Sequence, residues 1–209
     1  FFAADTKRES AKYLDAVRNK IAQIYKLTDP DLLAFAWIKD FYLFEPSEEG
    51  ATGMSKGKSG VQFAHNPFSK PACSLNELKK ARKERKEALL EIKACQFDLI
   101  CNNIEMFSGG ERCTDPQLLS EAFKAVGYTK EELNKNFKPI LEAFTYGPPP
   151  HGGLGQGVDR MLMILKGEDN VRELTAFPKT STCQDLMLGS PREVDQEVLD
   201  EMGLKIKKV

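Results

Sequence analysis

The most informative chemical pattern in this chain is the run from Pro148 to Arg160, which reads Pro-Pro-Pro-His-Gly-Gly-Leu-Gly-Gln-Gly-Val-Asp-Arg. Its glycines at 153, 155 and 157 recur at every second residue, so an extended strand would put them on one face. A strand face without side chains is costly to fold. A flat ligand lying against bare backbone explains that cost, although a bulge or a tight packing site would also suit the glycines. Because Asp159-Arg160 then opens an apolar segment, the run predicts a nucleotide platform followed by a fixed cation.

A second group of residues could hold a metal ion and an anion. Asp98 and Glu105 are hard oxygen ligands of the kind that magnesium prefers in phosphate chemistry. They are seven residues apart, so a regular strand would point them to opposite faces, and both reach one metal only across a bulge or bend. Otherwise they are two unrelated surface carboxylates. Arg112 follows shortly, and a guanidinium can grip a carboxylate through two parallel hydrogen bonds.

The chain has only two histidines, His65 and His151. His65 lies in the segment Phe-Ala-His-Asn-Pro-Phe, and His151 lies in the glycine-rich run. Either one alone could be structural. Both occur in loop or turn motifs rather than on apolar helix faces, and this favours a functional role.

Composition limits the classes of protein that fit. The 209 residues carry a net charge of -1, so any contact with nucleic acid must come from local basic patches rather than from a global field. No apolar run approaches the roughly 18 residues needed to span a membrane. Five cysteines without a Cys-x-x-Cys pair argue against zinc or a disulfide scaffold. We therefore expect reduced thiols and a cytoplasmic location, with no membrane partner.

Periodicity and turn residues predict the elements that must position these groups. We expect helices over 7–27, 75–93, 116–126 and from the capping box at Thr129 to Phe144, a buried strand over 33–44, a mobile loop over 48–60, a strand over 95–105 and a turn at 108–110. The basic cluster at 79–86 is either a solvated helix face or a contact with nucleic-acid phosphates.

The run from Pro148 to Arg160 resembles motif 3 of the class II aminoacyl-tRNA synthetases, in the form of the bacterial-type aspartyl enzymes. Residues 171–180, Val-Arg-Glu-Leu-Thr-Ala-Phe-Pro-Lys-Thr, resemble that family's final catalytic strand region. The resemblance covers nearly the whole chain. It implies an α+β fold with a class II antiparallel sheet flanked by helices, incomplete on its N-terminal side. It also implies that residues 1–28 are the end of an insertion domain with its connecting helix, and that 29–209 are the C-terminal half of the catalytic domain.

The resemblance also assigns roles to residues. It implies catalytic roles for Arg160 and Glu105, and a magnesium ion (Mg2+) held by Asp98 and Glu105. The implied aspartate-binding residues are His65, Arg112 and His151, and the implied ATP-binding residues are Glu105, Gly157, Val158, Asp159 and Arg160. Asn66 stands where the family often has a second histidine, and Gln156 replaces a usually apolar residue.

The implied reaction activates L-aspartate with ATP and transfers it to tRNA, in a full-length enzyme that is a homodimer. We find no anticodon-binding barrel, no motif 1 and no motif 2, so the chain alone is expected not to aminoacylate. An asparaginyl-type synthetase, or a non-catalytic paralogue that serves as an interaction module, are the alternatives.

Overall fold

A computed structural model describes residues 2–29, 31–47, 59–84 and 86–207 of the chain. Its contacts divide the chain into two compact units, Phe1–Gln156 and Gly157–Val209, which are described separately. Most of the loop expected over 48–60 lies outside the described residues. No helix in the described ranges is both long enough and apolar enough to cross a lipid bilayer.

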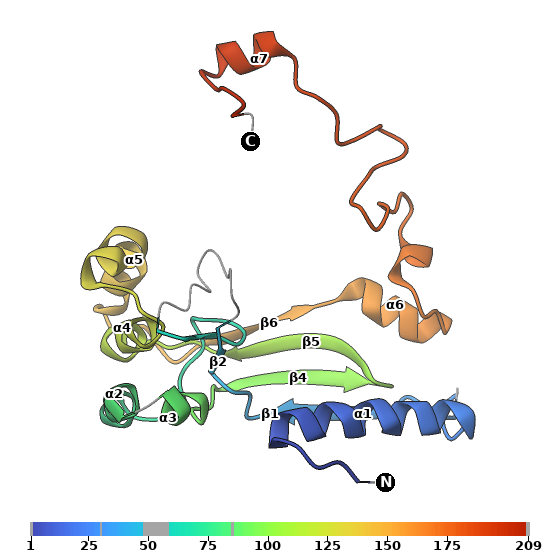
Figure 1. Cartoon of the computed structure of the whole chain (residues 1–209), viewed down its shortest axis with the longest axis horizontal. Coiled ribbons are helices and arrows are strands. Elements are labelled where there is room, and N and C mark those ends of the chain that lie inside the picture. The colour runs from blue at the N-terminus through green and yellow to red at the C-terminus, as the bar shows by residue number, and fades with distance from the viewer. Residues whose placement is uncertain (1, 30, 48–58, 85, 208–209) are drawn as a thin grey trace. The chain divides into compact units, whose positions relative to one another are not determined.

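An antiparallel sheet of four strands forms the middle of the first unit (Figure 1). Its strand order is β1 (Phe35–Lys39), β4 (Gln96–Cys101), β5 (Ile104–Glu111) and β6 (Gly152–Gln156). A separate two-stranded sheet pairs β2 (Phe44–Pro46) with β3 (Val61–Phe63). The expected antiparallel sheet is therefore confirmed, and the alternating-glycine segment is a strand at one edge of it.

The hairpin between β4 and β5 corrects one local prediction. The chain reverses at Asn102 and Asn103, whose φ angles are 49° and 68°, and asparagine tolerates this left-handed conformation better than most residues. The turn expected at 108–110 is wrong, because these residues lie inside β5. Gly109 serves a close approach rather than a turn, since a Cβ there would lie 2.6 Å from the carbonyl oxygen of Gly153.

The strand expected over 33–44 is shorter and more exposed than predicted. β1 is an edge strand, and all five of its residues are exposed within the described structure. The Trp37 ring stacks edge-on against Phe97 and Phe107, at centroid distances of 5.8 and 5.6 Å, yet Trp37 stays 58% exposed. Its aromatic and β-branched residues thus reflect strand preference and not burial.

Helices account for most of the rest of the first unit and for its core. They are α1 (Lys7–Ile24), α2 (Leu75–Glu84), α3 (Lys86–Leu90), α4 (Pro116–Ala125) and α5 (Lys130–Phe144). α2 to α5 gather at one end of the four-stranded sheet (Figure 1). The capping box at Thr129 is confirmed, because its side chain and that of Glu132 exchange hydrogen bonds with each other's backbone N–H. α4 ends before Gly127, whose φ of 98° suits glycine.

The hydrophobic core lies among these helices and the β2–β3 sheet. Phe123 is at its centre and is completely buried. The rings that pack against Phe123 come from β3, α5 and the connecting loops and are Phe63, Phe68, Tyr128 and Phe137. The core thus forms a rigid support beside the end of the sheet at which Arg112 leaves β5.

The second unit is mostly helical and irregular. It contains α6 (Val158–Lys166), a 3-10 helix at Val171–Leu174 and α7 (Gln196–Glu201). α6 ends at Gly167, which has a φ of 68°. The strand region expected over 171–180 is wrong, since this segment forms the 3-10 helix followed by irregular chain. The Asn170 side chain caps that helix by accepting the N–H of Arg172, a local alternative to strand pairing.

Candidate active site

A pocket of about 500 Å³ in the first unit gathers three of the residues that the sequence singled out. His65, Arg112 and His151 all line it, although they come from segments far apart in the chain. The rest of its wall is small or polar and consists of Asn66, Ser69, Gln96, Ser108, Gly109, Gly110, Gly152, Gly153, Leu154 and Gly155. Two histidines, one arginine and exposed backbone suit a small anionic ligand with a flat portion.

Arg112 is held from several sides where β5 ends. Its backbone N–H donates to the carbonyl of His151 at 2.9 Å, and the residue forms a bridge with Ser69 on the other side. Its guanidinium carbon lies 5.1 Å from the centre of the Phe68 ring. Stacking on an aromatic ring leaves the edge of a guanidinium available for a carboxylate. The half-buried Arg112 side chain is therefore well placed to bind an anion.

The two histidines are each oriented by an aromatic ring. His65 packs edge-on against Phe41 at 5.1 Å, and His151 packs against Phe144 at 6.2 Å. The Nδ1 atom of His151 lies 3.0 Å from the carbonyl oxygen of Pro149, to which it donates a hydrogen bond. In the neutral ring, Nε2 of His151 is then left as an acceptor.

Asn66, which departs from the family pattern, has a clear local role. Its side-chain oxygen accepts the N–H of Phe68 at 2.9 Å, and its backbone carbonyl accepts the N–H of Ser69 at 3.2 Å. This is an Asx turn, a structure for which asparagine is well suited. Asn66 therefore shapes the loop that carries His65 while it also lines the pocket.

Sequence reasoning missed two buried polar residues of the pocket wall. The amide nitrogen of Gln96 donates to the hydroxyl of Ser69 at 2.7 Å, and the two residues are 9% and 3% exposed. Buried polar groups need partners, and this pair ties β4 to the loop after His65. The only signal in the sequence was a glutamine at the start of a mostly apolar strand that also contains Asp98.

The glycine face of β6 opens directly on the pocket. A Cβ added at Gly153 or Gly155 would meet no atom within 4 Å, whereas one at Gly152 would lie 2.6 Å from the carbonyl oxygen of Gly110. Packing thus requires glycine at 152 but not at 153 or 155. The prediction that Gly157 continues this face is wrong, because β6 ends at Gln156 and Gly157 is the N-cap of α6.

Asp98 and Glu105 lie on neighbouring strands and share a face of the sheet. The pairing of β4 with β5 shifts between Leu99, opposite Phe107, and Ile100, opposite Glu105. Ile100 is on the face of Asp98 by strand alternation, so its partner Glu105 is on that face too. The bulge that the spacing required is therefore present. Neither carboxylate is among the residues that line the pocket.

The donor set of this face fits a magnesium ion. Magnesium is commonly bound through one or two carboxylates together with phosphate oxygens and waters. Asp98 and Glu105 supply two such carboxylates. Within the described ranges no group of three or more His, Cys, Asp or Glu side chains is placed to hold a metal ion.

The expected nucleotide residues Val158, Asp159 and Arg160 lie in the second unit, on the first turn of α6. A Cβ built on Gly157 would lie 3.1 Å from Cδ of Arg160, so the arginine side chain folds back over its own N-cap. A helix N-terminus with a nearby guanidinium attracts anions. Asp98 is opposite Ser108, which lines the pocket, so the carboxylate pair and the pocket share one face of the sheet, whereas Val158, Asp159 and Arg160 belong to the second unit.

Comparison with known proteins identifies the family. Residues 5–181 match the family described as "tRNA synthetases class II (D, K and N)". The chain belongs to this family. The class II synthetase relatives include the "Aspartate--tRNA(Asp/Asn) ligase" of Rickettsia canadensis, 39% identical over 206 residues, which are 99% of this chain and 33% of the relative. The enzyme of the same name from Pelagibacter ubique is 38% identical over 207 residues, which are 99% of this chain and 32% of that protein.

The chain thus spans about a third of the length of the class II synthetases that it matches. Among solved structures, it resembles an aspartyl tRNA synthetase from Entamoeba histolytica at 19% identity and a TM-score of 0.47, over 79% of this chain and 26% of the other. The family match confirms the expected fold class, an antiparallel sheet flanked by helices.

Proposed function

We propose that this chain is the C-terminal half of the catalytic domain of an aspartate–tRNA ligase, with residues 1–28 as the end of an insertion domain. The observation that carries the proposal is the pocket in which His65, Arg112 and His151 meet beside the bare face of β6. The relatives from Rickettsia canadensis and Pelagibacter ubique, both named aspartate–tRNA(Asp/Asn) ligase, support the same activity.

The charge of Arg112 favours aspartate as the amino acid. Its guanidinium can donate two parallel hydrogen bonds to the side-chain carboxylate, and Phe68 limits the directions in which the guanidinium can point. An asparagine side chain would leave the charge of this half-buried guanidinium without an anionic partner, which weakens its binding relative to aspartate. His65 and His151 flank the same ligand and offer further polar contacts.

The nucleotide would use the remaining groups. We assign the flat surface over Gly153 and Gly155 to the adenine of ATP. The ATP-binding role expected for Val158, Asp159 and Arg160 at the start of α6 belongs to the same proposal. A magnesium ion held by Asp98 and Glu105 would, when bound, offset phosphate charge. The homodimer and the cytoplasmic location that the family implies belong to the same proposal.

In the first step, a carboxylate oxygen of aspartate attacks the α-phosphorus of ATP. A bond forms between that oxygen and phosphorus, and pyrophosphate leaves. In the second step, a ribose hydroxyl at the 3′ end of tRNA attacks the activated carbonyl, loses its proton and displaces AMP. No protein nucleophile is needed, so this chain contributes positioning and charge stabilisation.

The proposal is tested by amino-acid-dependent ATP–pyrophosphate exchange in a complete enzyme that carries this chain. Arg112→Ala removes two charge-assisted hydrogen bonds worth about 1.5–3 kcal/mol each, so aspartate-dependent exchange should fall by at least about 100-fold. The matched control is Arg18→Ala, because Arg18 lies on α1 and forms an exposed ion pair with Asp15 at 2.7 Å.

Two results would contradict the proposal. The first is aspartate activation by the Arg112→Ala enzyme at the unchanged KM. The second is faster exchange with asparagine than with aspartate in the unsubstituted enzyme, which would favour the asparaginyl alternative. These 209 residues alone are expected to show no aminoacylation, because they correspond to about a third of the length of the relatives.

A further inference from the structure

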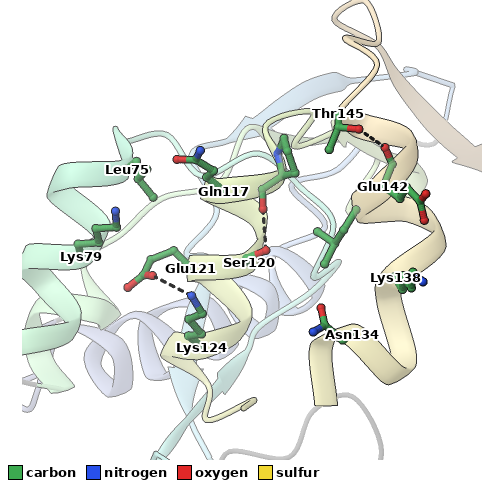
Figure 2. Close-up of a pocket in the computed structure, with 12 residues that line it drawn as sticks. Leu75, Lys79, Gln117, Ser120, Glu121, Lys124, Asn134, Lys138, Glu142 and Thr145 are labelled. Carbon is green, nitrogen blue, oxygen red and sulfur yellow. Dashed lines mark hydrogen bonds and ion pairs between the residues drawn. The ribbon is translucent and has the colours of Figure 1, made fainter. Parts of the chain in front are cut away.

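A second hollow of about 710 Å³ lies away from the active-site pocket, between α2, α4 and α5. Figure 2 shows the three helices with one lysine from each at this groove: Lys79 on α2, Lys124 on α4 and Lys138 on α5. The floor includes Leu75 and Leu141. Three lysines that are distant in sequence line one groove, so the fold gathers positive charge locally on a chain of almost neutral charge.

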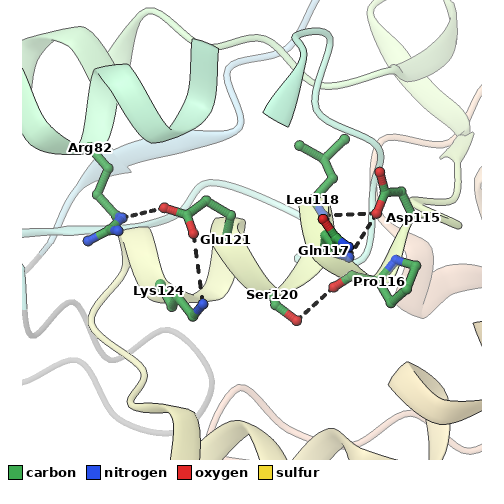
Figure 3. A network of polar contacts seen from close by, with 8 residues as sticks. All are labelled: Arg82, Asp115, Pro116, Gln117, Leu118, Ser120, Glu121 and Lys124. Carbon is green, nitrogen blue, oxygen red and sulfur yellow. Dashed lines mark hydrogen bonds and ion pairs between the residues drawn. The ribbon is translucent and has the colours of Figure 1, made fainter. Parts of the chain in front are cut away.

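The carboxylates of the groove do not cancel these cations. Glu121 has a side chain that is only 4% exposed, and it accepts a hydrogen bond from Nε of Arg82 at 2.6 Å (Figure 3). Lys124 lies 3.9 Å from the other oxygen of Glu121 and keeps 39% of its side chain exposed. Glu121 thus pairs with both Arg82 and Lys124, and Glu142 is the other carboxylate in the described lining, so the groove carries three lysines against two carboxylates.

Neutral polar groups complete the lining. Gln117 and Asn134 bring amides that can both donate and accept hydrogen bonds. The Ser120 hydroxyl donates to the carbonyl of Pro116 at 2.7 Å, which leaves its oxygen able to accept. Lysines interspersed with amides and hydroxyls are the usual side chains in contacts with phosphate and sugar groups.

The groove also lies close to the active-site pocket along the chain. Arg112 is four residues before Pro116, where α4 begins, and His151 is six residues after Thr145, which lines the groove. An extended chain covers at most about 3.6 Å per residue, so these pairs are separated by at most about 14 and 22 Å. An RNA whose 3′ end enters the pocket therefore has its neighbouring nucleotides within reach of the groove.

We propose that the groove between α2, α4 and α5 binds the phosphate backbone of the tRNA through Lys79, Lys124 and Lys138. This inference rests on the proposed function, because it assumes that tRNA is the substrate. An acidic protein segment could also use lysines above a leucine floor. RNA is favoured by the polar lining and by the short chain distance to the pocket.

The test is direct binding of tRNA to the complete enzyme, measured by fluorescence anisotropy between about 50 and 200 mM salt. Each lysine that neutralises one phosphate contributes about 0.9 to the steepness with which log K falls against log salt concentration. At 0.1 M salt, the loss of one such contact therefore corresponds to about an eightfold loss in affinity. Lys79→Ala, Lys124→Ala and Lys138→Ala should each weaken binding by about that factor and reduce the slope by about one. Glu142→Gln should strengthen it.

The matched control is Lys80→Ala, because Lys80 is the next residue on the same helix, pairs with Glu84 at 3.7 Å and does not line the groove. Binding should be unchanged in this variant, and melting temperatures should show that all variants fold. Equal losses from Lys79→Ala and Lys80→Ala would overturn the proposal, as would unchanged tRNA binding in all three groove variants.

Two further measurements separate this inference from the proposed function. Aspartate-dependent pyrophosphate exchange needs no tRNA, so it should be the same in the groove variants as in the unsubstituted enzyme. Failure of that exchange in the unsubstituted enzyme would refute the proposed function, whereas the binding assay reports on the groove alone. If Lys79→Ala weakens the binding of polyglutamate but leaves tRNA binding unchanged, the ligand of the groove is an acidic protein segment and not RNA.

Discussion

The glycines of β6 allow stability and ligand binding to be separated by two single-methyl substitutions. In Gly155→Ala, the new Cβ meets no protein atom within 4 Å and projects into the pocket. Alanine restricts the unfolded chain more than glycine does, so the free energy of unfolding should rise by about 0.5 kcal/mol. In Gly152→Ala, the Cβ would lie 2.6 Å from the carbonyl oxygen of Gly110, and overpacking of this kind costs about 1–3 kcal/mol.

The effects on catalysis should run in the opposite direction. A methyl group at 155 would lift the adenylate off the strand, and a misplacement of about 1 Å can reduce activity by about 100-fold. We therefore expect Gly155→Ala to lower kcat/KM for ATP in pyrophosphate exchange by about 10- to 100-fold, at an unchanged or higher melting temperature. An unchanged KM for ATP in the Gly155→Ala enzyme would refute the assignment of this face of β6 to the nucleotide. A lower melting temperature would show that the space beside Gly155 is not open to a methyl group.

Two further predictions concern titrating groups. Burial raises the pKa of the Cys113 thiol to about 11. At about pH 8, Cys113 should therefore react with a thiol reagent far more slowly than the exposed Cys183, and mass spectrometry of the labelled sites measures both rates. Comparable rates would contradict the burial of Cys113. Hydrogen bonds from the backbone N–H and the hydroxyl of Ser74 lower the pKa of Glu77 below its ordinary value of 4.5. Ionised Glu77 therefore stabilises the folded protein above pH 4.5, and this stabilisation is lost as the pH falls through the lowered pKa of the folded state. The gap in melting temperature between the native enzyme and Glu77→Gln should therefore close on acidification. A gap independent of pH would show that the stabilising effect of Glu77 does not depend on its charge.

Local signals in the sequence predicted α1, α4 and α5 closely, whereas the residues expected to form one helix over 75–93 contain α2 and α3, and α7 was not predicted. The capping box at Thr129 and the position of Gly127 are short-range features whose energetics are complete within a few residues. The same holds for β6, where alternating glycines leave few other options before a helix. These elements could be predicted because their stabilising contacts are close in sequence.

The errors arise where distant contacts decide the structure. Gly109 looks like a turn residue, but it lies within β5 because β6 comes too close for any side chain. Asn102 and Asn103 make the actual turn, and asparagine is a weaker signal than glycine. The exposure of β1 depends on its place at the edge of the sheet, which no pattern within the strand encodes.

The same division runs through the candidate site. Arg112, His65 and His151 were found from residue type and motif, and the structure brings them to one pocket. The buried bond between Gln96 and Ser69 could not be found in this way, because it joins residues 27 positions apart and neither carries a charge. Such supporting bonds become visible only when the strands are paired.

The supports of Arg112 bear directly on how the site would distinguish aspartate from asparagine. The two amino acids differ by one oxygen and one NH₂ group, so discrimination requires a cation that cannot move away when the wrong ligand enters. Arg112 is tied to His151 through its backbone N–H, to Ser69 through a β-bridge and to Phe68 through ring stacking. Ser69 is in turn fixed by Gln96. Because the arginine is anchored to the sheet rather than carried on a free loop, an asparagine in the pocket would face an uncompensated guanidinium, and the energetic penalty would fall on the wrong substrate.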